Sequence, residues 1–411
     1  MNRSVERKTT DRRVFSSESV TEGHPDKLAD QISDAVLDAA LREDPHSRVA
    51  CETLVTTGLV HITGEVTTRG FLDTEGIARQ TLRRAGYTSE DYGIHPDRCK
   101  VLRTLDEQST EIGQGVDGGG AGDQGMMFGY ATDEGSGLGI DLALMPVPIM
   151  LAHRLTRRLA EARGSGEVEW LRPDGKAQVS VEYVGDRPVS IDRVVVAAQH
   201  HPPGIELAGG AELTDAAIRQ TILEKIVLRA LSPTGIYDQD RADVIINGTG
   251  VFVEGGPKAD AGLTGRKIIV DTYGGAARHG GGAFSGKDAT KVDRSGAYAA
   301  RWIAKNVVAA GLASKVEIQV AYAIGKRDPV SLLVDSFGTA TTEGTKARSP
   351  DEVLQEKVGA VFDLRPQAIK DSLGLAKPIY LPTATYGHFG RKAEGDQFSW
   401  ERTDMVDELL K

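Results

Sequence analysis

One order of elements recurs three times along this chain: a long amphipathic helix, two neighbouring strands, and a second helix. In the first round, apolar residues at helical spacing follow Pro25, a favourable first position of a helix. Two alternating runs then meet near Thr57 and Gly58, as the strands of a hairpin do. The first round is expected to contain a helix from residue 25, strands 49–55 and 60–66 and a helix 73–85. The second is expected to contain a helix 149–162, strands 179–183 and 191–197 and a helix 215–231. The third is expected to contain a helix 294–310, strands 317–324 and 330–337 and a helix 350–362. This recurrence predicts an α/β (α+β) protein with an internal three-fold repeat.

Composition narrows the class of protein. The chain has 411 residues, enough for more than one structural unit, with 40% apolar and 26% charged residues as in ordinary globular proteins. Its net charge of −10 argues against general nucleic-acid affinity, so any polyanion must be held by local lysines and arginines. The cysteines, Cys51 and Cys99, make no disulfide framework, and no run of 18 apolar residues occurs. We therefore expect a cytoplasmic protein without membrane or nucleic-acid partners, with a frayed polar tail over residues 1–13.

The stretch of residues 279–293, HGGGAFSGKDATKVD, has the composition of a phosphate-binding loop. Consecutive glycines let a backbone approach a ligand closely, and their N–H groups can form a concave anion site. Lys287 and Lys291 suit a polyphosphate, and Asp293 could share Mg²⁺ with phosphate oxygens. The spacing differs from the P-loop pattern because Asp288 stands where Ser or Thr belongs. A polyphosphate loop is favoured over a plain glycine-rich turn.

Two further groups of residues are open to both structural and functional interpretations. His24, directly before the first helix, could donate to an anion at the helix N-terminus or could simply cap it, with Asp26 and Lys27 as surface charges. Glu52 and Glu65 are out of phase with the apolar residues of the first hairpin, so a solvated strand face is their ordinary interpretation.

Three other segments allow the same two interpretations. The glycine-rich stretch between Gln114 and Asp123 could be an ordinary flexible loop or a lid. Asp174 and Lys176 would pass as a turn and the start of a strand. Arg266 and Lys267 stand at the start of KIIVD, which is expected to be a strand, and two cations at a strand end need have no ligand.

Five blocks of the sequence together resemble S-adenosylmethionine synthetase (methionine adenosyltransferase). They are GHPDK at 23–27, GAGDQG at 120–125, GLTGRKIIVDTYGG at 262–275, GGGAFSGKD at 280–288 and YGHFGR at 386–391. The resemblance runs from about residue 15 to about residue 404. It implies three similar helix–hairpin–helix domains related by pseudo-threefold symmetry, over approximately 14–115, 120–247 and 248–404, with the chain crossing between them.

The resemblance also implies roles for individual residues. Catalytic roles are implied for His24, Lys176, Arg266 and Lys287. Contacts with ATP are implied for His24, Asp123, Asp174, Lys176, Phe252, Arg266, Lys267, Ala283 and Lys287, and contacts with methionine for Glu65, Gln114, Phe252, Asp260 and Lys291. Asp26 and Asp293 would bind Mg²⁺, with a pair of ions per site, and Glu52 would bind K⁺. The active unit would be a homodimer or homotetramer with sites at the subunit interface.

The implied reaction makes S-adenosylmethionine from ATP and L-methionine, with the triphosphate released and hydrolysed to phosphate and pyrophosphate. A thioether nucleophile carries no proton, so a chain without a nucleophile–base motif suits this chemistry. Three features depart from the family pattern: a short segment after Gln114, an apparent insertion at residues 135–143, and Val251 where arginine is common. They leave open an enzyme for a methionine analogue. A catalytically silent regulatory subunit and a kinase-like phosphotransferase also stay open.

Overall fold

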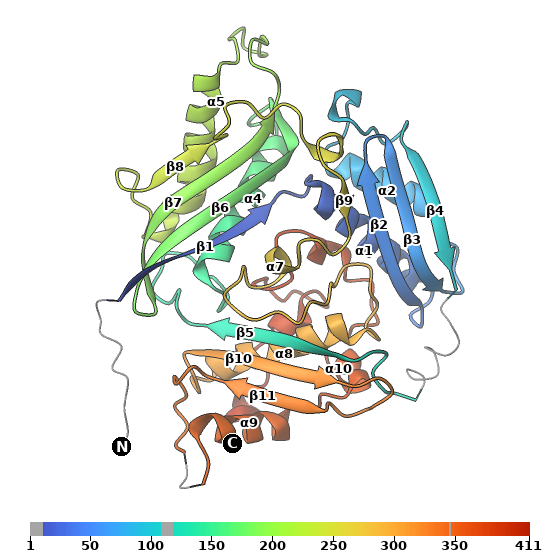
Figure 1. The fold of residues 1–411 in the computed structure, drawn as a ribbon, viewed down its shortest axis with the longest axis vertical. Helices are drawn as coiled ribbons and strands as arrows, with labels where there is room; N and C mark the ends of the chain where they lie inside the picture. The colour runs from blue at the N-terminus through green and yellow to red at the C-terminus, as the bar shows by residue number, and fades with distance from the viewer. Residues whose placement is uncertain (1–10, 108–117, 345–346) are drawn as a thin grey trace.

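The computed structural model describes residues 11–107, 118–344 and 347–411, and it shows a mixed α/β protein built on three β-sheets (Figure 1). The first sheet has the order β4 (Lys100–Asp106), β3 (Leu59–Thr67), β2 (Arg48–Thr56) and β9 (Gly262–Leu263). The second has the order β1 (Arg12–Val20), β6 (Leu171–Val184), β7 (Arg187–His200) and β8 (Asp243–Ile246). The third has the order β11 (Ser331–Asp335), β10 (Lys315–Tyr322) and β5 (Gly125–Thr132).

Each sheet is centred on one of the three expected hairpins. The pairs β2–β3, β6–β7 and β10–β11 are all antiparallel. Before them come the long helices α1 (Pro25–Glu43), α4 (Val147–Gly164) and α8 (Val292–Ala309). After them come the helices α2 (Thr74–Arg84), α5 (Asp215–Ile222) and α9 (Pro350–Val361). The predicted fold class and the recurring order of elements are therefore confirmed.

Each sheet also contains a strand from a distant part of the chain. β1 pairs with β6 in the second sheet, β5 with β10 in the third, and β9 with β2 in the first, each antiparallel. Because every sheet shares its hydrogen bonds with such a strand, the three lobes interlock. The domain ranges 14–115, 120–247 and 248–404 stay predictions.

Three local expectations differ from the structure. KIIVD is not a strand but contains the short helix α7 (Ile268–Asp271), because a short apolar run has no decisive periodicity and Asp271 turns inward to the buried ammonium of Lys27. The helix expected over 215–231 changes to a π-helix at Leu223–Leu228. The expected polar tail ends earlier than residue 13, since β1 begins at Arg12 and is held by ladder bonds to β6.

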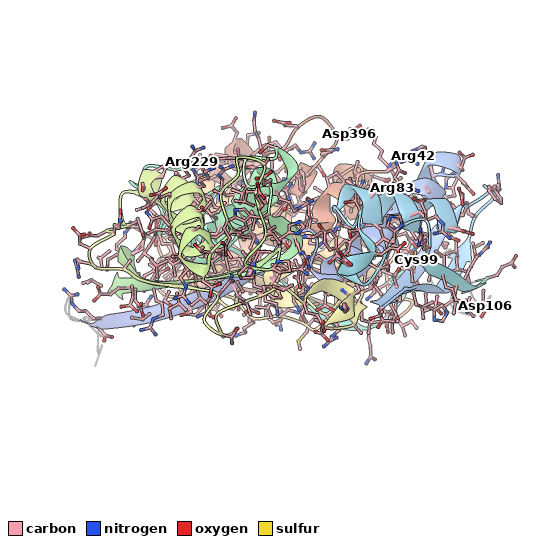
Figure 2. All side chains as sticks on the ribbon, turned by 90° about the horizontal axis from the view of Figure 1, so that it is seen from above. Arg42, Arg83, Cys99, Asp106, Arg229 and Asp396 are labelled. Atoms are coloured by element: carbon pink, nitrogen blue, oxygen red, sulfur yellow. The ribbon has the colours of Figure 1, made fainter. Side chains whose placement is uncertain are left out.

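The molecule is flat, with helices towards one broad side and sheets towards the other. In Figure 2, Arg42 of α1, Arg83 of α2 and Arg229 lie towards one side, and Asp106 of β4 lies towards the opposite side. Apolar residues of α1 and α8 share one core with the first and third sheets, whereas α4 forms a second core with β6 and β7. None of the described helices combines the length and hydropathy that crossing a bilayer requires.

Candidate active site

The N-terminus of α1 is fixed by close backbone packing. A Cβ on Gly23 would lie 2.3 Å from the carbonyl oxygen of Pro173, so only glycine fits there. His24 then caps the helix: its Nδ1 accepts a hydrogen bond from the backbone N–H of Asp26 at 3.2 Å. Because Nδ1 is the acceptor, the ring proton of the neutral imidazole resides on Nε2. Burial, together with the charges of Lys267 and Lys176, lowers the pKa of His24 to about 3. His24 is therefore a neutral hydrogen-bond donor at physiological pH.

Asp26 lies at the centre of a small group of charges. Its carboxylate accepts from the ammonium of Lys267 at 2.5 Å and from the backbone N–H of Leu263 at 3.0 Å, and the guanidinium of Arg266 lies 3.8 Å away. Burial opposes ionisation of Asp26, but the hydrogen bonds from Lys267 and Leu263 outweigh it and lower its pKa. The structure thus brings together His24, Asp26, Arg266 and Lys267, and places Lys176 close enough to affect the His24 ring.

Asp26 is the first of four buried aspartates at every fourth position of α1. Residues at this spacing lie on one face of a helix. Asp26 accepts from the N–H of Leu263, Asp30 from Gly265, Asp34 from Gly286, and Asp38 from Tyr380 and Leu381. This row of carboxylates fixes three loops against one helix. This row was not predicted from the sequence, although aspartate at every fourth residue is visible there.

The loop of residues 280–288 forms the second group of charges. Gly286 adopts a left-handed φ of +81°, and a Cβ there would lie 1.9 Å from the carbonyl oxygen of Cys51. The ammonium of Lys287 donates to Asp293 at 2.6 Å. A Cβ on Gly282 would lie 2.5 Å from the same carboxylate, so the glycine leaves space directly over it. Lys287 and Asp293 are both partly exposed, so a ligand can reach them.

Asp288, which departs from the P-loop pattern, holds this loop to the first sheet. It is buried and accepts from the ammonium of Lys291 at 2.6 Å and from the backbone N–H of Val49 at 2.7 Å. Burial opposes its ionisation, but Lys291 and the N–H donors outweigh burial and lower its pKa. Asp288 is therefore a structural anchor, and it positions Lys291 as well.

A third part of the candidate site lies where β6 meets the segment after β8. One carboxylate oxygen of Asp174 accepts from the backbone N–H of Gly256 at 2.8 Å, and the other is buried without a hydrogen-bond partner among the described residues. Burial raises the pKa of Asp174 to about 6. Phe252 is fixed by paired backbone and ring hydrogen bonds with His200, each 3.0 Å long. Lys176 is exposed, on the side of β6 that faces away from α4.

The remaining predicted residues are distributed around these groups. Glu52 and Glu65 are exposed on β2 and β3, as their phase predicted. Asp123 and Asp260 are exposed as well, and Ala283 adjoins Gly265, whose Cβ would lie 2.6 Å from its own. Gln114 lies outside the described residues.

Within one chain, these residues form separate groups. No hydrogen bond or ion pair between described residues connects the group of His24, Asp26, Arg266 and Lys267 with the pair Lys287–Asp293. Nor do the described residues contain a cluster of three or more metal-ligating side chains. Ligands that bridge these groups would therefore have to supply further oxygen atoms themselves.

Comparison with known proteins identifies the family. The chain matches the N-terminal domain of S-adenosylmethionine synthetase over residues 12–110, its central domain over 118–252 and its C-terminal domain over 254–402. It is 55% identical to an S-adenosylmethionine synthase of Nitratidesulfovibrio vulgaris over 400 residues, which is 96% of each chain. It is 53% identical to an S-adenosylmethionine synthase of Thermus thermophilus over 414 residues, covering 97% of this chain and 98% of the relative. The chain belongs to the S-adenosylmethionine synthetase family.

Two of the sequence blocks shared with the family contain buried residues with structural roles. Lys27 of GHPDK is not a surface charge: it is buried between Asp30 and Asp271, at 2.9 and 2.6 Å, and Asp26 is buried as well. The ammonium of Lys27 thereby anchors α7 to α1. His388 of YGHFGR is also buried and binds the hydroxyl of Tyr298 at 2.7 Å. Val251, one of the departures from the family pattern, is half exposed.

Proposed function

We propose that the protein is a methionine adenosyltransferase, which converts ATP, L-methionine and water into S-adenosylmethionine, phosphate and diphosphate. The observation that carries this proposal is the pairing of cation and carboxylate in both separate groups, Lys267 with Asp26 and Lys287 with Asp293, in a chain of this family. Each pair presents a lysine for phosphate oxygens and a carboxylate for a metal ion. Both pairs are only partly exposed, so the charges they present are weakly screened.

The reaction requires alignment of the two substrates and stabilisation of the leaving group. The sulfur of methionine attacks C5′ of ATP, the C5′–O bond breaks, and the electron pair leaves with the triphosphate. Lys176, Lys287 and Arg266 would stabilise the growing negative charge, as oriented cations do in other enzymes. His24 would donate its Nε2–H to the leaving oxygen, because Nδ1 is already occupied by the Asp26 N–H. Water then cleaves the bound triphosphate beside the same cations.

The substrate-binding roles are proposed from the family resemblance, and for Asp174 a structural observation supports the proposal. Asp174 has one buried oxygen without a partner among the described residues, which suits an acceptor for a hydroxyl of the nucleotide. Phe252 offers an aromatic surface beside it. ATP contacts are further assigned to Lys267, Ala283 and Asp123, and methionine contacts to Glu65, Gln114, Asp260, Lys291 and Phe252.

The carboxylates of the candidate site fit the coordination that Mg²⁺ usually has in proteins. Mg²⁺ usually takes one or two protein carboxylates, with water and substrate phosphates as its other ligands. Asp26 and Asp293 are such carboxylates, each bound to a lysine that a phosphate could draw away. When bound, Mg²⁺ would neutralise phosphate charge. Glu52 is the proposed carboxylate for K⁺, and two Mg²⁺ sites would follow from Asp26 and Asp293 acting separately.

The proposed active unit is a homodimer, alone or paired into a tetramer, with the sheets facing each other. Exposed apolar residues occur on strands of all three sheets, namely Val14, Leu102, Met126, Leu263 and Leu333. A partner on this side would bring its own Lys287–Asp293 pair towards the group around Asp26. We further propose a cytoplasmic location, which the two free, buried cysteines support because thiols persist in a reducing compartment.

One assay tests the activity. Purified protein with ATP, L-methionine, Mg²⁺ and K⁺ should form S-adenosylmethionine, phosphate and diphosphate in equal amounts, identified by mass. ADP as the main nucleotide product would overturn the proposal in favour of a phosphotransferase, and no product at all would favour a silent subunit.

A complementation experiment tests the shared site. If Lys176 and Lys287 of one site come from different chains, mixing inactive K176A and K287A proteins restores one intact site in each mixed dimer. Random exchange should then recover about a quarter of the parental activity. No recovery, in mixtures shown by mass spectrometry to contain mixed dimers, would place both lysines in one chain.

A further inference from the structure

A cavity of about 340 Å³ lies beside α4 and has no part in the proposed reaction. Its lining comes from α4, from the apparent insertion at residues 135–143, from α6 (Arg229–Leu231) and from the loop at Gly390. Arg229 marks the helix side of the molecule in Figure 2, opposite the outward face of the sheets. The volume of the cavity is at the small end of the range for ligand pockets, about 300–1,000 Å³.

The cavity has an excess of positive charge. Four arginines line it, against Asp141 and Glu161. Two of these arginines have carboxylate partners: Arg158 and Arg229 both pair with Glu167. The other two, Arg154 and Arg157, make no ion pair with any described residue. They are three residues apart on α4 and so lie on one face of the helix.

The free guanidinium groups are held in place without being neutralised. Nε of Arg154 donates to the carbonyl oxygen of Ala230 at 2.6 Å, and no other hydrogen bond occupies its two terminal nitrogens among the described contacts. The guanidinium of Arg157 lies over the ring of Tyr386, 5.3 Å from its centre. Guanidinium groups suit a phosphoryl group, which binds arginine through paired hydrogen bonds.

A buried polar atom at the same cavity also lacks a partner. His153 lines the cavity and is 2% exposed, and its Nδ1 bonds to Ser19 at 2.8 Å. Its Nε2 has no hydrogen-bond partner in the described structure. Arg391 adds a further cation nearby, and its guanidinium donates to the carbonyl oxygens of Thr385 and Gly387. Burial and the charge of Arg157 lower the pKa of Arg391 to about 10. The charges of Arg157 and Arg391 repel each other, so an anion here would relieve that repulsion.

The apparent insertion contributes part of the lining of this cavity. Ile140, Asp141 and Leu142 form one wall. The segment is fixed at Gly139, where a Cβ would lie 2.2 Å from the carbonyl oxygen of Pro233. At its other end, Arg301 donates to the carbonyl oxygen of Ala143 at 2.6 Å. Ala143 and Leu144 both adopt left-handed backbone angles, φ 52° and 59°, which cost energy in residues other than glycine.

We propose that this cavity is a binding site for a small phosphoryl anion of the size of diphosphate, held by Arg154 and Arg157 and separate from the active site. The site is connected to the active side of the second sheet, because His153 bonds Ser19 of β1, and Ser19 pairs with Ala177, the neighbour of Lys176. The proposal does not depend on the proposed function.

Isothermal titration calorimetry with inorganic diphosphate in EDTA tests the site. Diphosphate should bind the K176A/K287A protein, in which two of the proposed active-site lysines are absent. Adding R154Q/R157Q to that protein should weaken binding at least ~10-fold, because two charge-assisted contacts are lost. The matched control is R42Q/R83Q, which removes two arginines from the same broad side and should leave binding unchanged.

Two results would overturn the proposal: no saturable diphosphate binding to K176A/K287A, or equal affinity with and without R154Q/R157Q. A measurement on the unmutated chain covers the case in which the arginine variants do not fold. Diphosphate should slow hydrogen exchange of the backbone amides at 150–158 and 386–391, even when a non-hydrolysable ATP analogue fills the active site. Absence of that protection would equally rule out the site.

Discussion

The buried pair of Asp34 and Arg294 should determine both stability and the position of the phosphate loop. Both side chains are inaccessible to solvent. The guanidinium donates to the two carboxylate oxygens at 2.7 and 3.0 Å, and the same carboxylate accepts from the backbone N–H of Gly286 at 2.8 Å. Asp34→Asn keeps the shape and one acceptor oxygen but removes the charge. The buried guanidinium of Arg294 is then left without a counter-ion.

Removing one member of a buried ion pair costs about 3–5 kcal/mol. We expect D34N to lower the free energy of unfolding by that amount. For a chain of this size, the urea slope is at least roughly 3 kcal/mol per molar, so the midpoint should fall by about 1 M. The control is E356Q, which breaks the exposed pair of Arg348 and Glu356 and should cost less than about 1 kcal/mol.

The measurement is equilibrium urea unfolding by circular dichroism at one fixed protein concentration, since self-association would shift the midpoint. Equal midpoint shifts for D34N and E356Q would refute the reasoning. D34N should also lower kcat, because Gly286 directly precedes Lys287. Full activity in a destabilised D34N protein would show that Arg294 alone positions the loop.

Three further predictions follow from the site. Lys287→Ala and Lys176→Ala should each lower kcat by at least ~10²-fold with little change in unfolding midpoint, and near-parental kcat in both would remove them from leaving-group stabilisation. Asp293→Asn should shift the Mg²⁺ dependence of the rate to higher concentration, whereas an unchanged titration would leave Asp293 only its contact with Lys287. Asp174 has a pKa near 6 in the fold and near ~4 when unfolded, so the ligand-free protein should lose stability as pH rises from ~4 to ~6. Asp174→Asn should flatten that decline when melting temperatures are compared at the two ends of this range.

Electrostatic contacts along α1 explain why this helix is so highly charged and yet buried. Its apolar residues contribute to the main core, whereas its aspartates face the loops after β8 and before α8. Each carboxylate accepts hydrogen bonds from backbone N–H groups of distant segments. A charged helix face of this kind resembles a solvated surface in the sequence, and only its contacts distinguish the two.

The site residues were proposed from the family blocks, and the structure brings one group of them together, His24, Asp26, Arg266 and Lys267. Close backbone contacts require glycine at Gly23 and Gly286, so the glycines of these two blocks can be recognised in the sequence. The hairpins and long helices were predictable because periodicities of 2 and 3.6 residues arise within a few turns of chain. The exposure of Glu52 and Glu65 follows from the same alternation.

Only the tertiary structure shows the features that depend on contacts between residues far apart in the sequence. KIIVD was expected to be a strand but became helix α7, since Asp271 turns to Lys27 from 244 residues away in sequence. Arg12 and Arg13 were expected to belong to a frayed tail, but they start strand β1, which is fixed by pairing with β6. The roles of Asp34, Asp288 and the free arginines at Arg154 and Arg157 likewise rest on which charges lie nearby. Local periodicity specifies the elements, but the pairing of buried charges depends on the whole fold, because burial makes every unpaired charge costly.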